Sequence, residues 1–211
     1  MERVAFDAGE SSGDPTTDID RRGLSGPLDT DGLAINRYRI PPGEGFPSGL
    51  HTHADQEEVF VALDGTATFE TLPERDPSEP RADDDATDAR RGREITVEAG
   101  EAVRFAPGEY QSGYNRGDAD LVALAVGAPR ATTDVRVPVR CPDCGAADFA
   151  LDARGEVIAF RCPDCDAERV PAPCPDCGSD TLTLTLDDGA VVAACEDCGA
   201  AFDEPPYRDD D

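Results

Sequence analysis

Apolar residues between positions 33 and 126 occur in short runs that Pro and Gly interrupt. None of these runs repeats with the three-to-four-residue spacing of an amphipathic helix, so each is interpreted as a strand. The predicted strands span 33–40, 58–63, 67–72, 94–97, 102–105 and 121–126. Short strands with frequent turn signals and no helices predict an all-β fold, a sandwich or barrel over residues 31–135.

Three segments lack this pattern. Residues 1–30 are polar and rich in turn formers, and we expect a tail or a short leading strand there. Residues 73–93 contain three prolines and no apolar periodicity, which predicts a disordered acidic loop between two strands. Residues 204–211 are expected to form an acidic tail.

The last third of the chain contains an internal repeat with an offset of 33 residues. Each unit has a Cys-x-x-Cys turn, seventeen intervening residues and a second Cys-x-x-Cys turn. The intervening residues have the pattern strand, Gly, strand, which predicts a hairpin that joins the two turns. The units span 137–170 and 171–203, and their cysteines are Cys141, Cys144, Cys162, Cys165, Cys174, Cys177, Cys195 and Cys198.

Four cysteines at this spacing suit tetrahedral zinc. The pattern resembles the zinc ribbon and implies two structural Zn²⁺ ions, one for each repeat. Because every ligand is a cysteine, no coordination position remains for a substrate. Units of this size have too small a core to fold unaided, so metal binding should supply the folding energy. The alternatives are rubredoxin-type iron, a redox dithiol and pairing across the repeats, and the constant offset argues against the last.

The formal net charge is −27, from 46 acidic and 19 basic residues, and all of the basic residues are Arg. This composition resembles that of halophilic archaea, in which charge keeps proteins soluble in concentrated salt. An acidic, partly disordered protein is the alternative. Residues 138–211 contain 5 Arg and 18 acidic residues, which disfavours a nucleic-acid partner. No apolar run reaches the roughly 20 residues that cross a bilayer, and we expect a cytoplasmic protein without a membrane partner.

The two histidines of the chain, His51 and His53, lie two positions apart and are followed by Glu58. Residues at this spacing on a strand face the same side. Two imidazoles and a carboxylate form a facial triad that binds a divalent metal and leaves positions open. The sequence therefore predicts a metal site, and the alternative is a metal-free pocket.

The spacing of five residues resembles the first signature of the cupin superfamily, and residues 100–115 resemble the second. The five residues are Gly45, His51, His53, Glu58 and Gly65. The resemblance covers residues 33–128 and implies a jelly-roll barrel, a homodimer and a divalent metal (Fe, Mn, Ni or Zn). In the second signature Gln111 replaces the family's fourth ligand, a His, and its amide oxygen would be a weaker ligand.

Two functions are consistent with these features. The first is a binding or regulatory module, in which the barrel holds a metal or small-molecule ligand and the ribbons contact a protein partner. The second is a metal-dependent enzyme of the oxygenase or isomerase type. Arg37 and Arg39 share one face of a strand and could hold an anionic substrate, but we favour a solvated outer face, opposite Tyr38 and Ile40.

Overall fold

The computed structural model describes residues 1–11, 17–72, 91–152 and 158–208. These residues form seventeen strands and no helix, which confirms the all-β prediction. Within these ranges there is no helix that could span a membrane. Most of the predicted loop at 73–93 lies outside the described residues. Its last residue, Arg93, belongs to a strand rather than to a loop.

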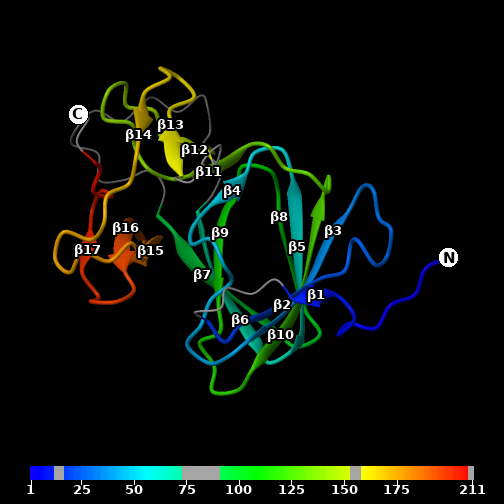
Figure 1. Ribbon diagram of the computed structural model, residues 1–211. Coiled ribbons are helices and arrows are strands. Elements are labelled where there is room, and N and C mark those ends of the chain that lie inside the picture. Colours follow the sequence, from blue (N-terminus) through cyan, green and yellow to red (C-terminus); the bar gives the residue numbers. More distant parts are fainter. Residues whose placement is uncertain (12–16, 73–90, 153–157, 209–211) are drawn as a thin grey trace.

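Six antiparallel strands form the larger wall of a barrel, in the order β1, β2, β3, β10, β5 and β8 (Figure 1). Their bounds are β1 Glu10–Ser11, β2 Asp20–Gly23, β3 Ala34–Ile40, β10 Leu121–Ala128, β5 Glu57–Asp64 and β8 Ala102–Phe105. Buried and half-buried residues alternate along β10, so one face of this sheet lines the interior. Residues 20–23, expected to be tail or leading strand, join the wall by pairing with β3.

Three strands form the opposite wall: β7 (Arg93–Glu98), β6 (Thr66–Leu72) and β9 (Tyr110–Tyr114). Aromatic side chains fill the space between the two walls. Phe60 of β5 and Phe69 of β6 contact each other with ring centroids 4.9 Å apart, and Phe46 and Phe105 pack on the same cluster. Two antiparallel sheets closed around one core form a jelly-roll barrel.

The first ribbon continues the smaller wall of the barrel. Strand β4 (Thr52–His53) is linked to β9 by a single bridge between His51 and Gln111. Its other edge pairs with β11 (Val135–Val137). Both strands belong to a five-stranded sheet with the order β4-β11-β12-β13-β14, in which β4 is an edge strand. The ribbon strands are β12 Phe149–Asp152, β13 Ala159–Arg161 and β14 Glu168–Arg169. The barrel and the ribbon therefore share one run of backbone hydrogen bonds.

The second ribbon packs against the barrel through its hairpin. It contains β15 (Leu182–Asp187), β16 (Ala190–Cys195) and β17 (Ala201–Phe202), and it lies beside the barrel in Figure 1. The amide of Leu50 donates to the Leu184 carbonyl at 2.8 Å. Gly49 has φ +59°, and a Cβ there would lie 2.4 Å from Thr183 Oγ1, so the close approach requires glycine.

The C-terminal segment, expected to be an acidic tail, contacts residues 170–172 through residues 206–208. Tyr207 forms a bridge with Pro171, and the amide of Arg208 donates to the Val170 carbonyl at 2.9 Å. The ring of Tyr207 packs on the core of the first ribbon beside Phe160. Its aromatic surface gains more from this packing than from exposure, which holds the segment in place.

Candidate metal centre

The barrel brings the predicted ligands together. His51 immediately precedes β4, His53 ends it, and Glu58 lies on β5 in the opposite wall. Their ligand atoms all lie within 4.8 Å of one another. Gln111 joins them from β9, where its backbone exchanges hydrogen bonds of 2.8 and 3.1 Å with His51. The chain thus assembles these four side chains from three strands and the residue next to one of them.

Each imidazole is oriented by a hydrogen bond at Nδ1. His51 Nδ1 donates to the Gly49 carbonyl at 2.9 Å, and His53 Nδ1 donates to Thr132 Oγ1 at 3.2 Å. The Thr132 hydroxyl in turn donates to Asp55. In both rings Nε2 is left with its lone pair toward the centre, the arrangement that metal-binding histidines use.

Thr132 and Asp55 are functional residues that the sequence analysis missed. Thr132 lies 79 positions from His53 and belongs to no recognisable motif. Asp55 follows His53 closely, but nothing in the sequence distinguishes it from the other acidic residues. Hydrogen bonds to its carboxylate, first that from the Thr132 hydroxyl, lower the pKa of Asp55 to about 2. It therefore stays ionised and holds Thr132 in place at neutral pH.

Gln111 lies in the site but presents its amide nitrogen to the other ligands. Nε2 donates to Glu58 Oε2 at 3.1 Å and lies 3.5 Å from His51 Nε2. A half-turn about the last side-chain torsion would bring Oε1 to the same place, because that torsion is roughly two-fold. Gln111 can therefore hold the Glu58 carboxylate or act as a weak fourth ligand, but not both at once.

Burial controls the charges of the site. It lowers the pKa of His51, although the hydrogen bond to Gly49 opposes this. It also lowers the pKa of His53 to about 4, with a further decrease from His51. Burial raises the pKa of Glu58 to about 7, although the Gln111 amide stabilises the carboxylate. The 3.5 Å contact between His53 and Glu58 is therefore not an ion pair at neutral pH.

These residues fit a divalent cation. Two neutral imidazoles offer lone pairs, and a buried carboxylate near the middle of its titration lacks only a positive charge beside it. The donor set of two His and one carboxylate suits Fe, Mn, Ni or Zn. His51, His53 and Glu58 would hold the ion, and Gln111 would complete the set after its amide turns.

Arg37 and Arg39 do not belong to the site. Tyr38 and Ile40 are buried in the barrel core, so the residues between them point outward. Arg37 pairs with Asp20 at 3.1 Å and Arg39 pairs with Asp120 at 2.6 Å. The favoured interpretation, an outer face, agrees with these contacts; the Arg39 side chain is 50% exposed, whereas that of Arg37 is 18% exposed.

Metal binding in the barrel should depend on pH through Glu58. Its raised pKa of about 7 means that a proton must leave before a cation binds. The apparent affinity for Co²⁺ is therefore expected to rise about tenfold per pH unit from pH 5.5 to 7 and to level off above. His53 adds no slope in this window, because burial lowers its pKa to about 4; burial also lowers the pKa of His51.

Co²⁺ titrations of protein with zinc in both ribbons would measure this slope. Glu58→Gln is the matched control, because it keeps the shape of the side chain and removes the proton. It should bind more weakly and show no pH dependence over the same range. A flat profile in the unmodified chain would contradict the role of Glu58.

The eight cysteines form two separate clusters of four, one in each repeat, so pairing across the repeats is wrong. In the first, Cys141 and Cys165 Sγ are 3.8 Å apart and Cys144 and Cys162 Sγ are 3.5 Å apart. The corresponding distances in the second are 3.7 and 3.6 Å. Zinc–sulfur bonds of about 2.3 Å at tetrahedral angles place sulfurs roughly 3.8 Å apart, so both clusters fit zinc.

All four turns use the same backbone conformation after their second cysteine. Gly145, Gly178 and Gly199 have φ between +73° and +79°, and Asp166 has φ +61°. This conformation directs backbone amides at the sulfurs; the amide of Cys198, for example, lowers the pKa of Cys195 to about 6. Asp166 tolerates the left-handed region because a short polar side chain permits it, and it pairs with Arg161 at 2.9 Å.

No protein-family model and no curated protein matches this sequence. Among solved structures, an uncharacterized double-stranded β-helix protein from Klebsiella pneumoniae is 14% identical (TM-score 0.43), over 62% of this chain and 92% of its own. A predicted oxalate decarboxylase from Thermotoga maritima is 20% identical (TM-score 0.45; 60% and 98%). A cupin-superfamily sugar phosphate isomerase from Silicibacter pomeroyi is 18% identical (TM-score 0.45; 84% and 95%).

The class of this protein follows from its own strands and ligands. Two antiparallel sheets enclose an aromatic core. Two histidines and a glutamate converge on the inner side of the walls. The chain is an all-β protein with a jelly-roll barrel, followed by two small hairpin domains that each hold a four-cysteine cluster.

Proposed function

We propose that this chain is a cupin protein that binds a metal, a small ligand or both, is stabilised by two structural zinc ions, and acts as a binding or regulatory module. The observation that carries this proposal is the convergence of His51, His53 and Glu58 within 4.8 Å. The Nδ1 atom of each imidazole forms a hydrogen bond, which leaves Nε2 as the atom that would bind the metal.

The ribbons support a structural role for zinc. Each cluster has four cysteines and no water or substrate position, which is the pattern of structural rather than catalytic sites. One ribbon extends the barrel sheet and the other packs on the barrel through Leu50 and Leu184. We propose that a protein partner would use the ribbon surfaces that remain exposed.

The alternative function is a metal-dependent enzyme of the oxygenase or isomerase type. It is favoured by the three-ligand set, because a facial triad leaves coordination positions open for substrate or dioxygen. Turnover that disappears when the third metal is removed would favour the enzyme. Ligand binding without turnover would favour the module.

Metal analysis tests the proposal. Protein purified in high salt is expected to hold two zinc ions and a third divalent metal for each chain. The double variant His51→Ala, His53→Ala should lose the third metal and keep both zinc ions. Arg39→Ala, on the outer face of the barrel, is the control and should keep all three. Two zinc ions and no third metal, even after incubation with Fe²⁺, Mn²⁺, Ni²⁺ and Zn²⁺, would overturn the proposed barrel site.

Three further features belong to this proposal. The charge of −27 suits a cytoplasm with concentrated salt. All eight cysteines lie within the described residues and none of them forms a disulfide, which supports a role as metal ligands; a reducing compartment is part of the proposal. The homodimer rests on the family resemblance and is tested by the mass of the protein in solution.

A further inference from the structure

Arg21 points into the barrel. On strand β2, Asp20 and Arg22 pair with each other at 2.9 Å on the outer face, whereas Ile19, the residue before the strand, packs against the barrel core. Since side chains alternate along a strand, Arg21 lies on the inner side with Ile19. Its register partner is Tyr38, a core residue, and the guanidinium carbon lies 5.8 Å from the centre of that ring.

The guanidinium of Arg21 lacks the partners that such a group needs. Nε is buried and has no hydrogen-bond partner among the described residues. Nη2 makes one long contact, 3.4 Å to Asn36 Oδ1. Arg22 and Arg37 share Asp20 on the outer face, but within the described ranges no carboxylate pairs with Arg21. A guanidinium with a buried donor that lacks a partner lowers the stability of the folded protein unless an anion pairs with it.

Two further polar side chains, Asn36 and Tyr38, lie beside Arg21. Burial raises the pKa of Tyr38; the charge of Arg21 opposes this increase and the charge of Glu58 adds to it. The phenol therefore lies within electrostatic reach of both Arg21 and the metal-binding carboxylate.

Small side chains lie beside these polar groups in the wall. Ile40 and Leu121 are paired and are both 0% exposed, so the barrel is sealed there. One inward position further along, the pairs become Tyr38 with Ala123 and then Asn36 with Ala125. Tyr38 and Ala125 keep 8% and 7% of their surface exposed. Each of these two polar residues is thus paired with an alanine, which covers less of its neighbour than a large side chain would.

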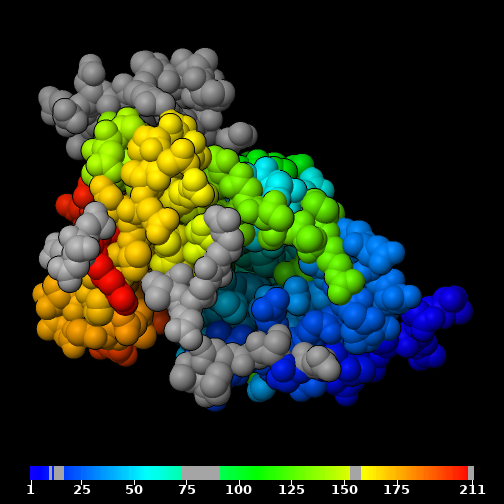
Figure 2. All heavy atoms as spheres, turned by 45° about the horizontal axis from the view of Figure 1, so that its top comes forward, coloured from blue at the N-terminus to red at the C-terminus, as the bar shows by residue number. Residues whose placement is uncertain are grey.

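We propose that Arg21, with Tyr38 and Asn36, forms an anion site on the inner wall of the barrel that binds a carboxylate of the small-molecule ligand. This inference deepens the proposed ligand-binding function and rests on it. A carboxylate matches the planar fork of a guanidinium and carries one charge, as Arg21 does. A phosphate dianion would need further cations, and the chain contains no Lys and has a net charge of −27. In Figure 2 the N-terminal end of the chain (blue) and the two ribbons (yellow to red) lie on opposite sides of the molecule.

Calorimetric titration of the full chain tests the proposal, with succinate, adipate and suberate as probes and their diamides as neutral controls. At one fixed KCl concentration, at least one dicarboxylate should bind to the unmodified protein, and its diamide should not. Arg21→Gln is expected to weaken that binding about tenfold or more, as a lost charged hydrogen bond predicts. Arg22→Gln, one position along on the outer face, is the matched control and should leave binding unchanged.

A second variant separates a binding role from a structural one. Arg21→Met keeps the apolar contact with Tyr38 and removes the unpaired charge, so its midpoint of thermal unfolding should rise while dicarboxylate binding is lost. A lower midpoint, equal binding by Arg21→Gln, or equal binding of the diamides would each overturn the anion site.

Repeating the titration with and without Co²⁺ distinguishes the two proposals. If no third metal loads, the proposed metal site fails, whereas dicarboxylate binding that Arg21→Gln abolishes would still support the anion site. If Co²⁺ loads and Arg21→Gln binds dicarboxylates as the unmodified chain does, the anion site fails and the metal site stands.

Discussion

A chain in which Cys177 is replaced by Ser should hold one structural zinc instead of two and lose the order of its second ribbon. Structural zinc contributes about 10–16 kcal/mol of binding free energy to small domains of this kind. The hairpin of β15 and β16 has few buried residues of its own; Val192, Ala193 and Cys195 are the buried ones. With only three thiolates left, the second cluster should no longer bind zinc. The binding free energy of zinc is then lost from the folding of this ribbon.

This loss should reach the barrel, because the hairpin covers part of its wall. Leu50, Leu72 and Tyr110 are buried, and Leu184, Leu186 and Val191 of the hairpin pack against them. Release of the hairpin would expose these residues and break the hydrogen bond from the Leu50 amide to Leu184. Since Leu50 precedes His51, we expect the affinity of the barrel for a third metal to fall about tenfold, as loss of an outer contact to a metal ligand does.

Zinc content by mass spectrometry and hydrogen exchange at the Leu50 amide would measure the two effects. Asp176→Ser is the matched control, because Asp176 is exposed in the same turn and is not a ligand. This variant should keep two zinc ions, and hydrogen exchange at its Leu50 amide should remain slow. If Cys177→Ser loses a zinc while Leu50 exchange and barrel metal affinity stay unchanged, the ribbon is an independent unit and the coupling is wrong.

The sequence predicted those features that depend on short spacings. The cysteine turns, their repeat and the shared face of His51 and His53 all follow from positions within a few residues. Glu58 was predicted as a ligand from the five-residue spacing that ends at Gly65, and the structure places Glu58 with the histidines. Strand alternation also placed Tyr38 inside and Arg37 outside.

Features that depend on long-range packing could not be predicted in this way. Thr132 reaches His53 across 79 positions, and the pairing of β2 with β3 decides that Arg21 faces inward. The C-terminal segment was interpreted as a tail because its acidic residues dominate, although Tyr207 finds an apolar surface in the first ribbon. Such contacts depend on which surfaces meet after folding, and composition alone carries no information on them.

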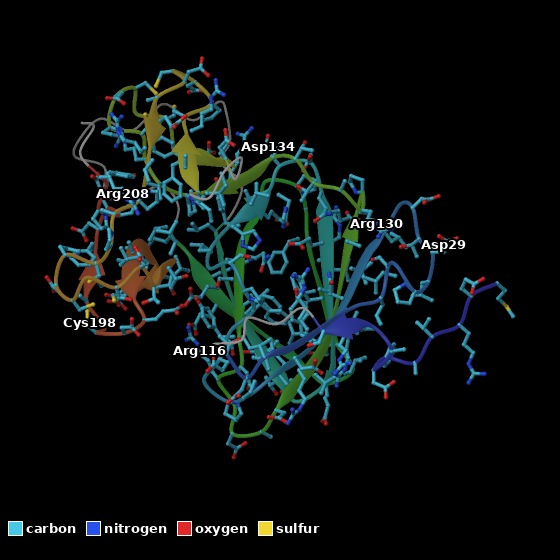
Figure 3. All side chains as sticks on the ribbon, viewed as in Figure 1. Asp29, Arg116, Arg130, Asp134, Cys198 and Arg208 are labelled. Carbon is cyan, nitrogen blue, oxygen red and sulfur yellow. The ribbon has the colours of Figure 1, made fainter. Side chains whose placement is uncertain are left out.

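Glu70 connects the second ribbon to the barrel, and its charge should matter more than that of any surface carboxylate. Its side chain is only 2% exposed. Oε2 accepts from the Thr185 hydroxyl at 2.7 Å and from the Leu186 amide at 3.0 Å, and Oε1 accepts from Arg116 at 2.7 Å. Arg116 lies on the side of the barrel toward the ribbon with Cys198 (Figure 3).

Glu70→Gln is expected to lower the free energy of unfolding by about 2–3 kcal/mol, because buried donors would lose a charged acceptor and the new amide would face Arg116. Glu94→Gln is the matched control. Glu94 also pairs with Arg116, but its side chain is 50% exposed. Solvent screens such a pair, so we expect a change within about 0.5 kcal/mol. Denaturant unfolding of the two variants would measure the difference, and equal losses would contradict the proposed role of burial.

Glu70→Gln also distinguishes the effect of the contact between the second ribbon and the barrel from the effect of the zinc site. Glu70→Gln alters no thiolate, so the chain should keep two zinc ions while exchange at the Leu186 amide becomes faster. Cys177→Ser should accelerate the same amide with one zinc lost. If both variants also weaken the third metal, the contact between ribbon and barrel is what supports His51, and zinc acts on the barrel only by holding that contact together. If only Cys177→Ser weakens the binding of the third metal, the loss of zinc affects His51 through contacts other than those of Glu70.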